Sequence, residues 1–240
     1  MKPYKSKGII FRTLKYSETS IISDIYTREK GLKSFIVSGV RTSKSGSKAA
    51  IYQNLNIVEL VANDVESDRL SRINEIRLDH HYQLVNRNVI HSAVAIFILE
   101  VCRQSIKEKE CNSDLYDFLE KWLKLLDEKA LFHPCLHHVF MIQLSNELGF
   151  GPLNNFSMEN RYFDLAEGIF SSENINHDTI SEIESISFNQ LLLYEKNPMA
   201  VLNWQKQTRD IMTNLLIKYF KYHIDGFKDL NSLEVLRNIL

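Results

Sequence analysis

The sequence has 240 residues, of which 44% are hydrophobic and 25% charged, a composition typical of a folded protein with a buried core. Its three cysteines are scattered and it has no signal-peptide core, which excludes a secreted domain held by disulfides. Its longest apolar run (residues 93–99) is far below the ~20 residues that span a bilayer, which excludes a membrane span. The net charge of −1 is divided unevenly, with +8 on residues 1–48 and −9 on the rest, and this asymmetry indicates an electrostatic role for the N-terminal part.

The first third of the chain has the pattern of short β-strands. Runs rich in Ile, Val, Thr and Tyr predict strands over residues 8–13, 21–27, 32–37, 55–62 and 70–78. Residues 28–31 end in glycine and suit a tight hairpin turn, whereas residues 39–48, rich in Gly, Ser and Lys, are interpreted as a flexible loop. Closely spaced short strands predict a small closed barrel, and the pattern leaves an SH3-like barrel or a small sandwich open.

From about residue 84 the apolar period changes from two residues to the 3.6 of an α-helix. We expect helices over about residues 85–101, 114–126, 134–148, 179–194, 201–223 and 232–240. Ser113 or Asp114 is the expected N-cap of the second helix, and Gly149 with Pro152 is the expected stop of the third. Residues 153–178 are predicted to form an irregular insertion with a short hairpin.

The change of period also predicts the domain organisation. We expect a β domain over residues 1–80 and a helical domain over residues 81–240, with the boundary within residues 79–86. The fold class is therefore α+β, in which a small N-terminal β-barrel precedes an all-helical domain that carries the insertion.

Four groups of short motifs follow one another along the chain. They are GIIF at 8–11 with YSETS at 16–20, YTREKG at 26–31 leading into GVRTSKS at 39–45, LGFGP at 148–152, and YFKYHI at 219–224 with LNSL at 230–233. In order and spacing they resemble the RecO family of bacterial recombination-mediator proteins, over nearly the whole chain. The resemblance implies an N-terminal OB-fold and a C-terminal helical domain.

The resemblance also implies a function and partners. Members of the family bind single- and double-stranded DNA, anneal complementary strands, and cooperate with RecR and with the C-terminal tail of single-stranded-DNA-binding protein to help load RecA. We therefore expect a cytoplasmic, nucleoid-associated DNA repair and recombination factor that is not an enzyme and needs no cofactor.

The chain departs from the family at one point. Many members carry a four-cysteine zinc site just after the segment that matches residues 148–152, but residues 153–175 contain no cysteine. A tetrahedral Cys₄ zinc site is therefore impossible there. The insertion must be held by packing instead, with its aromatic side chains as candidates: Phe156, Tyr162, Phe163 and Phe170.

DNA binding needs cations along a groove and flat side chains on which bases stack. On OB-folds the usual surface is the face of strands 2 and 3 with the adjoining loops. The candidate phosphate contacts are Lys7, Arg12, Lys15, Arg28, Lys33, Arg41, Lys44 and Lys48. Arg41, Lys44 and Lys48 are the strongest of them because a Gly- and Ser-rich loop can follow an irregular strand. A solvated lysine surface is the alternative interpretation.

Three aromatic residues of the β domain could stack on bases, although the barrel core is the favoured place for each: Tyr26, Phe35 and Tyr52. In the helical domain, four cations near apolar helical faces could receive the acidic partner tail, although ordinary surface charges are favoured: Arg103, Lys107, Lys121 and Lys124.

The sequence gives little support for an enzyme or a metal site. His133 and His137 are four residues apart and could share a helix face near Cys135, but the glutamate of an H-E-x-x-H motif is absent, so partly buried histidines are favoured. Glu18 and Asp24 are isolated carboxylates without the pattern of a nuclease site. We expect no catalytic and no metal-binding residues.

Two other functions remain open at this stage. One is a generic RNA- or DNA-binding OB module joined to an unrelated helical domain, which a strand-annealing assay distinguishes from a recombination mediator. The other is a protein-interaction adaptor whose barrel binds no nucleic acid, which a mobility shift at low and high salt tests directly.

Overall fold

The structure is a computed structural model that describes residues 3–40, 46–63, 70–107, 109–129, 132–174, 177–196 and 202–240. The chain packs as two compact units. The first comprises residues 1–99 and 106–130, and the second comprises residues 100–105 and 131–240. The expected domain boundary after residue 80 stays a prediction. Within the described ranges, no helix combines the length and the apolar character that crossing a bilayer requires.

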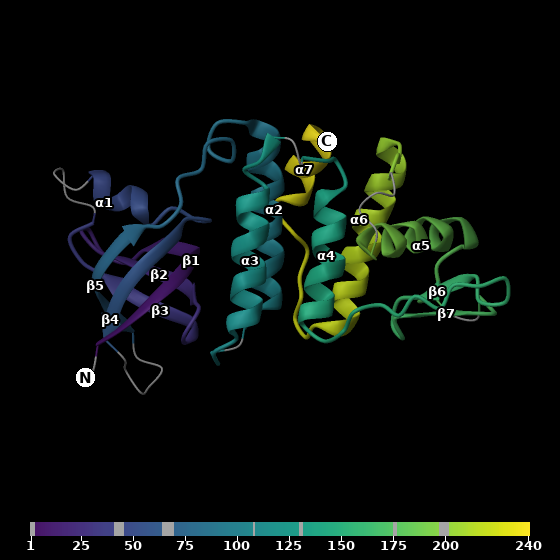
Figure 1. Cartoon of the computed structure of the whole chain (residues 1–240), viewed down its shortest axis with the longest axis horizontal. Helices are drawn as coiled ribbons and strands as arrows, with labels where there is room; N and C mark the ends of the chain where they lie inside the picture. The colour runs from purple at the N-terminus through teal and green to yellow at the C-terminus, as the bar shows by residue number, and fades with distance from the viewer. Residues whose placement is uncertain are drawn as a thin grey trace. The chain divides into compact units, whose positions relative to one another are not determined.

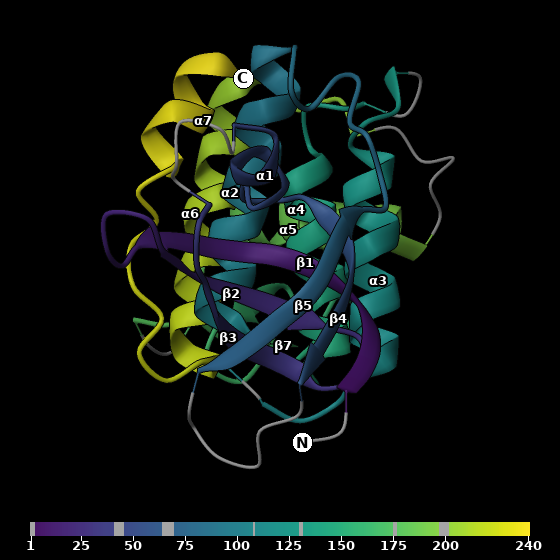
Figure 2. The same cartoon turned by 90° about the vertical axis from the view of Figure 1, so that its left-hand side faces the viewer.

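Five strands of the first unit close into a barrel: β1 (Pro3–Lys15), β2 (Ile21–Thr27), β3 (Gly31–Val37), β4 (Ile57–Asn63) and β5 (Ser71–Leu78). Their order is β1-β2-β3-β5-β4, and β4 returns to pair with β1 (Figure 2). Only the β3–β5 pair is parallel among the strand pairs of this barrel. This is the OB-type arrangement, so the expected barrel is confirmed over the SH3-like and sandwich alternatives.

The interior of the barrel is filled by alternate residues of each strand, as a period of two requires. Ile10, Ile25 and Phe35 are completely buried in this core. The short helix α1 (Gly46–Ile51) follows β3, and Ile51 and Tyr52 pack against the same core. The expected loop over residues 39–48 is therefore wrong for residues 46–48, which form the start of α1, a helix whose apolar end is anchored in the barrel by Ile51.

Two helices complete the first unit, α2 (Val89–Ser105), whose last residues belong to the second unit, and α3 (Ser113–Leu125). The helix expected from residue 85 begins later because Asn88 accepts a hydrogen bond from the Ile90 N–H at 2.9 Å. The N-cap of α3 is Asn112, which accepts from the Leu115 N–H at 3.0 Å, rather than Ser113 or Asp114. Asparagine is among the strongest N-cap residues, which explains both boundaries.

The second unit contains α4 (Leu136–Glu147), β6 (Tyr162–Asp164), β7 (Ile169–Ser171), α5 (Glu182–Lys196), α6 (Lys206–His223) and α7 (Leu233–Ile239). The helices α4, α5 and α6 contact one another, and α5 also contacts β6 (Figure 1). The helix expected from residue 201 begins only at Lys206, since residues 202–205 are not helical and Gln205 is extended.

The insertion between α4 and α5 contains the expected short hairpin, in which β6 pairs with β7, and aromatic packing holds this hairpin. Phe163 stacks on Phe188 of α5 with ring centroids 4.2 Å apart, and Phe170 meets Phe163 at 4.9 Å. Phe156 packs edge-on against Phe170 at 5.2 Å. The expectation that aromatic packing holds this segment is confirmed for Phe156, Phe163 and Phe170, which reach Phe188 of α5, whereas the role expected of Tyr162 stays a prediction.

Candidate nucleic-acid interface

Helix α3 covers part of the outer surface of β1 and β2. Phe11 stacks on Tyr26 at 5.5 Å between ring centroids, and Tyr26 stacks on Tyr116 of α3 at 6.3 Å. All three rings are at most 2% exposed. This part of the barrel is sealed by apolar contacts and cannot receive a ligand.

Lys7 lies at the edge of this covered part of the barrel and forms ion pairs with acidic side chains. Its Nζ is 3.0 Å from Glu120 Oε1 and 3.2 Å from Asp79 Oδ2. Glu120 also accepts from Lys124 at 2.6 Å. The hydrogen bond to Glu120 is the largest cause that raises the pKa of Lys7. Burial raises the pKa of Glu120, but the hydrogen bonds from Lys124 and Lys7 outweigh it and leave this pKa below its ordinary value.

Arg28 is engaged in the same way. Its Nε and one terminal nitrogen each lie 2.8 Å from a carboxylate oxygen of Asp117, a bidentate pair with α3. The hydrogen bond to Asp117 raises the pKa of Arg28. Lys7 and Arg28 therefore neutralise acidic residues of the chain itself, which makes them poor phosphate contacts.

A second part of the outer surface stays open, where β1, β2, β3 and β5 lie side by side. In register, Asp24 of β2 lies between Arg12 of β1 and Ser34 of β3. In the next row, Ile36 of β3 lies beside Arg72 of β5. We call this surface the strand face, and its residues are Arg12, Leu14, Ile22, Asp24, Ser34, Ile36 and Arg72.

The strand face carries exposed cations at both of its sides. Arg12 on β1 and Arg72 on β5 are exposed and form no ion pair with any described residue. Leu14, which is 41% exposed, and the half-buried Ile22 and Ile36 lie between them. A surface with cations flanking apolar side chains can hold phosphates at its sides and bases or sugars across its middle.

Arg72 is the residue of this surface that the sequence did not reveal. It lies outside the basic residues 1–48, and it reaches the strand face only because β5 pairs in parallel with β3. No local pattern predicts a pairing between strands separated by this length of chain.

The remaining candidate cations are placed differently. Lys15 is exposed at the end of β1, and Lys48 is exposed on α1. Lys33 pairs with Ile25, whose side chain is in the barrel core, so it occupies an inward position at the start of β3. Arg41 and Lys44 lie outside the described residues.

The three aromatic candidates for base stacking are all buried, but not in one place. Phe35 (0% exposed) and Tyr52 (4%) belong to the barrel core, as expected. The expectation is wrong for Tyr26 (1%), which is buried on the outer side of β2 by its stack with Tyr116 of α3. Burial raises the pKa of Tyr52 to about 12.

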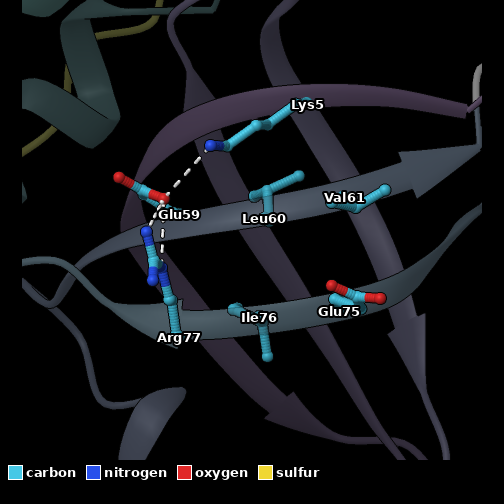
Figure 3. Close-up of a pocket in the computed structure, with 7 residues that line it drawn as sticks. All are labelled: Lys5, Glu59, Leu60, Val61, Glu75, Ile76 and Arg77. Carbon is cyan, nitrogen blue, oxygen red and sulfur yellow. Dashed lines mark hydrogen bonds and ion pairs between the residues drawn. The ribbon is translucent and has the colours of Figure 1, made fainter.

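The outer surface of β1, β4 and β5 has a depression of about 320 Å³ (Figure 3). Glu59 lies at its side and pairs with Arg77 at 2.6 Å and with Lys5 at 3.6 Å. The hydrogen bond from Arg77 lowers the pKa of Glu59. Glu75 also lines the depression, so its two cations are matched by two carboxylates and it has no excess charge for a polyanion.

Within the described ranges, His, Cys, Asp and Glu form no group of three or more that could hold a metal ion. His133 precedes α4, so the helix face that it could have shared with His137 does not form. The rings of His137 and His138 are 3.8 Å apart, and both Nε2 atoms lie within 3.1 Å of Thr213 Oγ1 on α6. These histidines are therefore part of the packing between α4 and α6.

The four cations considered for a partner tail are not gathered by any contact that the structure describes. Lys124 pairs with Glu120, while Arg103, Lys107 and Lys121 are exposed on their segments. Their role stays a prediction.

Comparison with known proteins gives a consistent result along the chain. Residues 1–82 match the family model described as "Recombination protein O N terminal", and residues 87–234 match "Recombination protein O C terminal". A DNA repair protein RecO of Flavobacterium psychrophilum is 33% identical, and one of Phocaeicola vulgatus is 30% identical. In both cases the similarity covers 98% of each chain.

Proposed function

Given that the chain belongs to the RecO family of DNA repair proteins, we propose that its barrel binds DNA on the strand face and that the protein acts as a non-enzymatic recombination mediator. The observation that carries this proposal is the pair of exposed cations, Arg12 and Arg72, which form no ion pair with any described residue and lie on the surface that OB-folds commonly use. Lys15 and Lys48 extend the positive charge at the adjoining segments.

Annealing of complementary strands follows from binding of this kind without any covalent chemistry. Cations that neutralise phosphates lower the repulsion between two backbones, while contacts that exchange rapidly leave the bases free to search for register. The proposed role includes loading of the recombinase onto single strands coated with single-stranded-DNA-binding protein, in cooperation with RecR. The helical unit is the proposed site for the partner tail, through basic residues beside apolar helical surface.

The proposed face is tested by removing its two cations. The double variant Arg12→Ala/Arg72→Ala should bind single-stranded DNA more weakly, and by a similar factor for unrelated sequences. The slope of log affinity against log salt should flatten by about 1.4, since each lost contact with a single strand accounts for about 0.7. Fluorescence anisotropy titrations of a labelled oligonucleotide at several salt concentrations measure both quantities.

The matched control is Arg87→Ala, which removes an exposed arginine that lies outside the barrel strands. Its affinity and salt slope should stay close to those of the unchanged protein. An unchanged salt slope in the Arg12/Arg72 variant would show that DNA does not bind the strand face.

The basic segment after β3 supplies a second, separate test. Replacing Arg41, Lys44 and Lys48 together by Ala should flatten the slope of log affinity against log salt by the equivalent of up to ~3 phosphate contacts. The effect should be the same for DNA of any sequence.

Annealing of short complementary strands, with and without single-stranded-DNA-binding protein, distinguishes a mediator from a passive binder, because a passive binder does not accelerate pairing.

A further inference from the structure

We propose that Tyr16 is a base-stacking contact of this barrel and that it makes the protein favour single-stranded over double-stranded nucleic acid. The inference rests on the proposed DNA-binding function and adds to it a residue and a preference between the two forms of DNA.

Tyr16 differs from the other aromatic residues of the barrel in its exposure. Tyr16 is 60% exposed, whereas Phe11, Tyr26 and Phe35 are at most 2% exposed. A tyrosine that stabilises a fold normally lies in the core, where its large ring gains most from burial. The ring of Tyr16 therefore contributes little to the fold and is available to a ligand.

The turn that carries Tyr16 is held by its own hydrogen bonds. The N–H groups of Tyr16 and Ser17 donate to Ser20 O at 3.0 and 3.2 Å, and the Ser20 N–H donates to Ser17 Oγ at 3.1 Å. The Val40 N–H donates to Thr19 O at 3.1 Å and ties the turn to the segment after β3. An aromatic ring on a fixed support binds with less loss of conformational entropy than one on a mobile loop.

Cations and apolar surface lie along the strand that leads to Tyr16. Lys15 is the last residue of β1, and Arg12 lies about 13 Å back along the strand from Tyr16, given a rise of about 3.3 Å per residue. Both are exposed, and Leu14 between them is exposed on the strand face. A backbone that runs along β1 can place phosphates on the cations and one base on the tyrosine.

The same geometry disfavours a duplex. In a double helix both faces of each base are covered by neighbouring bases, so a ring on the protein surface reaches a base face only after unstacking, at a cost of about a few kcal/mol. The arginines and lysines contact phosphates of either form. Tyr16 should therefore strengthen binding to a single strand and leave binding to a duplex nearly unchanged.

The test compares the full chain with Tyr16→Ala on three labelled ligands of equal length. These are a thymidine oligonucleotide of about 16 nucleotides, an abasic strand that keeps every phosphate, and a duplex. Tyr16→Ala should weaken binding to the thymidine strand about 5- to 150-fold, the range that corresponds to one stacked base. Binding to the abasic strand and to the duplex should change less than about twofold.

Three variants of the same turn complete the test. Tyr16→Phe should bind like the unchanged protein, because stacking needs the ring and not the hydroxyl. Tyr16→Trp should gain fluorescence that the thymidine strand quenches and the abasic strand does not. Glu18→Gln should raise affinity for the thymidine and abasic strands by the same factor, because it changes only charge.

An equal loss on thymidine and abasic strands, or no loss on either, would overturn the inference while leaving the proposed function in place. If the unchanged protein binds none of the three ligands, it is the proposed function that fails. The two failures are therefore distinct in one set of titrations.

Discussion

At the scale of single residues, glycine determines how closely the barrel can approach the segment before α3. Gly31 ends the turn between β2 and β3 with a φ of +63°, and a Cβ built on it would lie 2.2 Å from Glu110 O. Cys111 Sγ donates to Arg28 O at 3.3 Å in the same contact. The turn therefore touches the residues before α3 backbone to backbone, at a distance that only glycine allows.

This contact gives a prediction with a matched control. Gly31→Ala should destabilise the protein more than Gly39→Ala, which has a similar φ of +73° but no described residue within 4 Å of the added Cβ. The control should cost about 1–2 kcal/mol for the left-handed conformation alone. Urea unfolding measures both free energies, and equal losses in the two variants would contradict the steric role of Gly31.

At the scale of elements, α4 and α6 are joined by a polar contact inside an otherwise apolar interface. Thr213 Oγ1 of α6 lies 2.9 Å from His138 Nε2 and 3.1 Å from His137 Nε2, and it donates to Arg209 O at 2.9 Å. Both histidines are at most 2% exposed. Most buried polar groups in proteins are hydrogen-bonded, and the two Nε2 atoms and the threonine hydroxyl follow this rule.

The contact predicts a difference between two substitutions of similar size. Thr213→Val removes the hydroxyl from this buried site and should lower the free energy of unfolding by about 1–3 kcal/mol. Thr213→Ser keeps the hydroxyl and should cost less. Chemical unfolding followed by circular dichroism measures the difference, and equal stability of the two variants would show that the hydroxyl is not needed.

At the scale of the whole molecule, the charge asymmetry of the sequence overstates the positive surface of the barrel. Two basic residues of the N-terminal part, Lys7 and Arg28, pair with acidic residues of α3. The cations left open are fewer, and they are distributed around the strand face. The protein is therefore expected to bind DNA through a local surface rather than through its net charge.

The buried histidines predict how stability depends on pH. Burial lowers the pKa of His138 to about 4 and holds the pKa of His137 well below its usual range. The unfolded chain takes up protons below about pH 6.5 while the folded chain does not, so stability falls as pH drops from about 6.5 toward 4. At pH 5 one such histidine lowers the free energy of unfolding by about 2 kcal/mol.

Unfolding free energies at pH 7 and pH 5 test this expectation. His138→Gln should lose less stability than the unchanged protein between the two values, because glutamine does not titrate. His81→Gln is the control, since His81 is exposed, and it should keep the full pH dependence. A pH dependence that is the same in all three proteins would assign the effect to other groups.

The sequence by itself determined the five barrel strands, the helices other than α1, and their order, because the apolar period acts within a few residues. It also determined that residues 153–175 cannot form a four-cysteine zinc site. Only the tertiary structure decided which cations stay open, because Glu120 and Asp117 reach Lys7 and Arg28 from far along the chain. In the same way, strand pairing placed Arg72 beside Ile36, and packing buried Tyr26 while leaving Tyr16 exposed. Contacts between distant residues depend on how whole elements pack, and no local pattern of side chains encodes them.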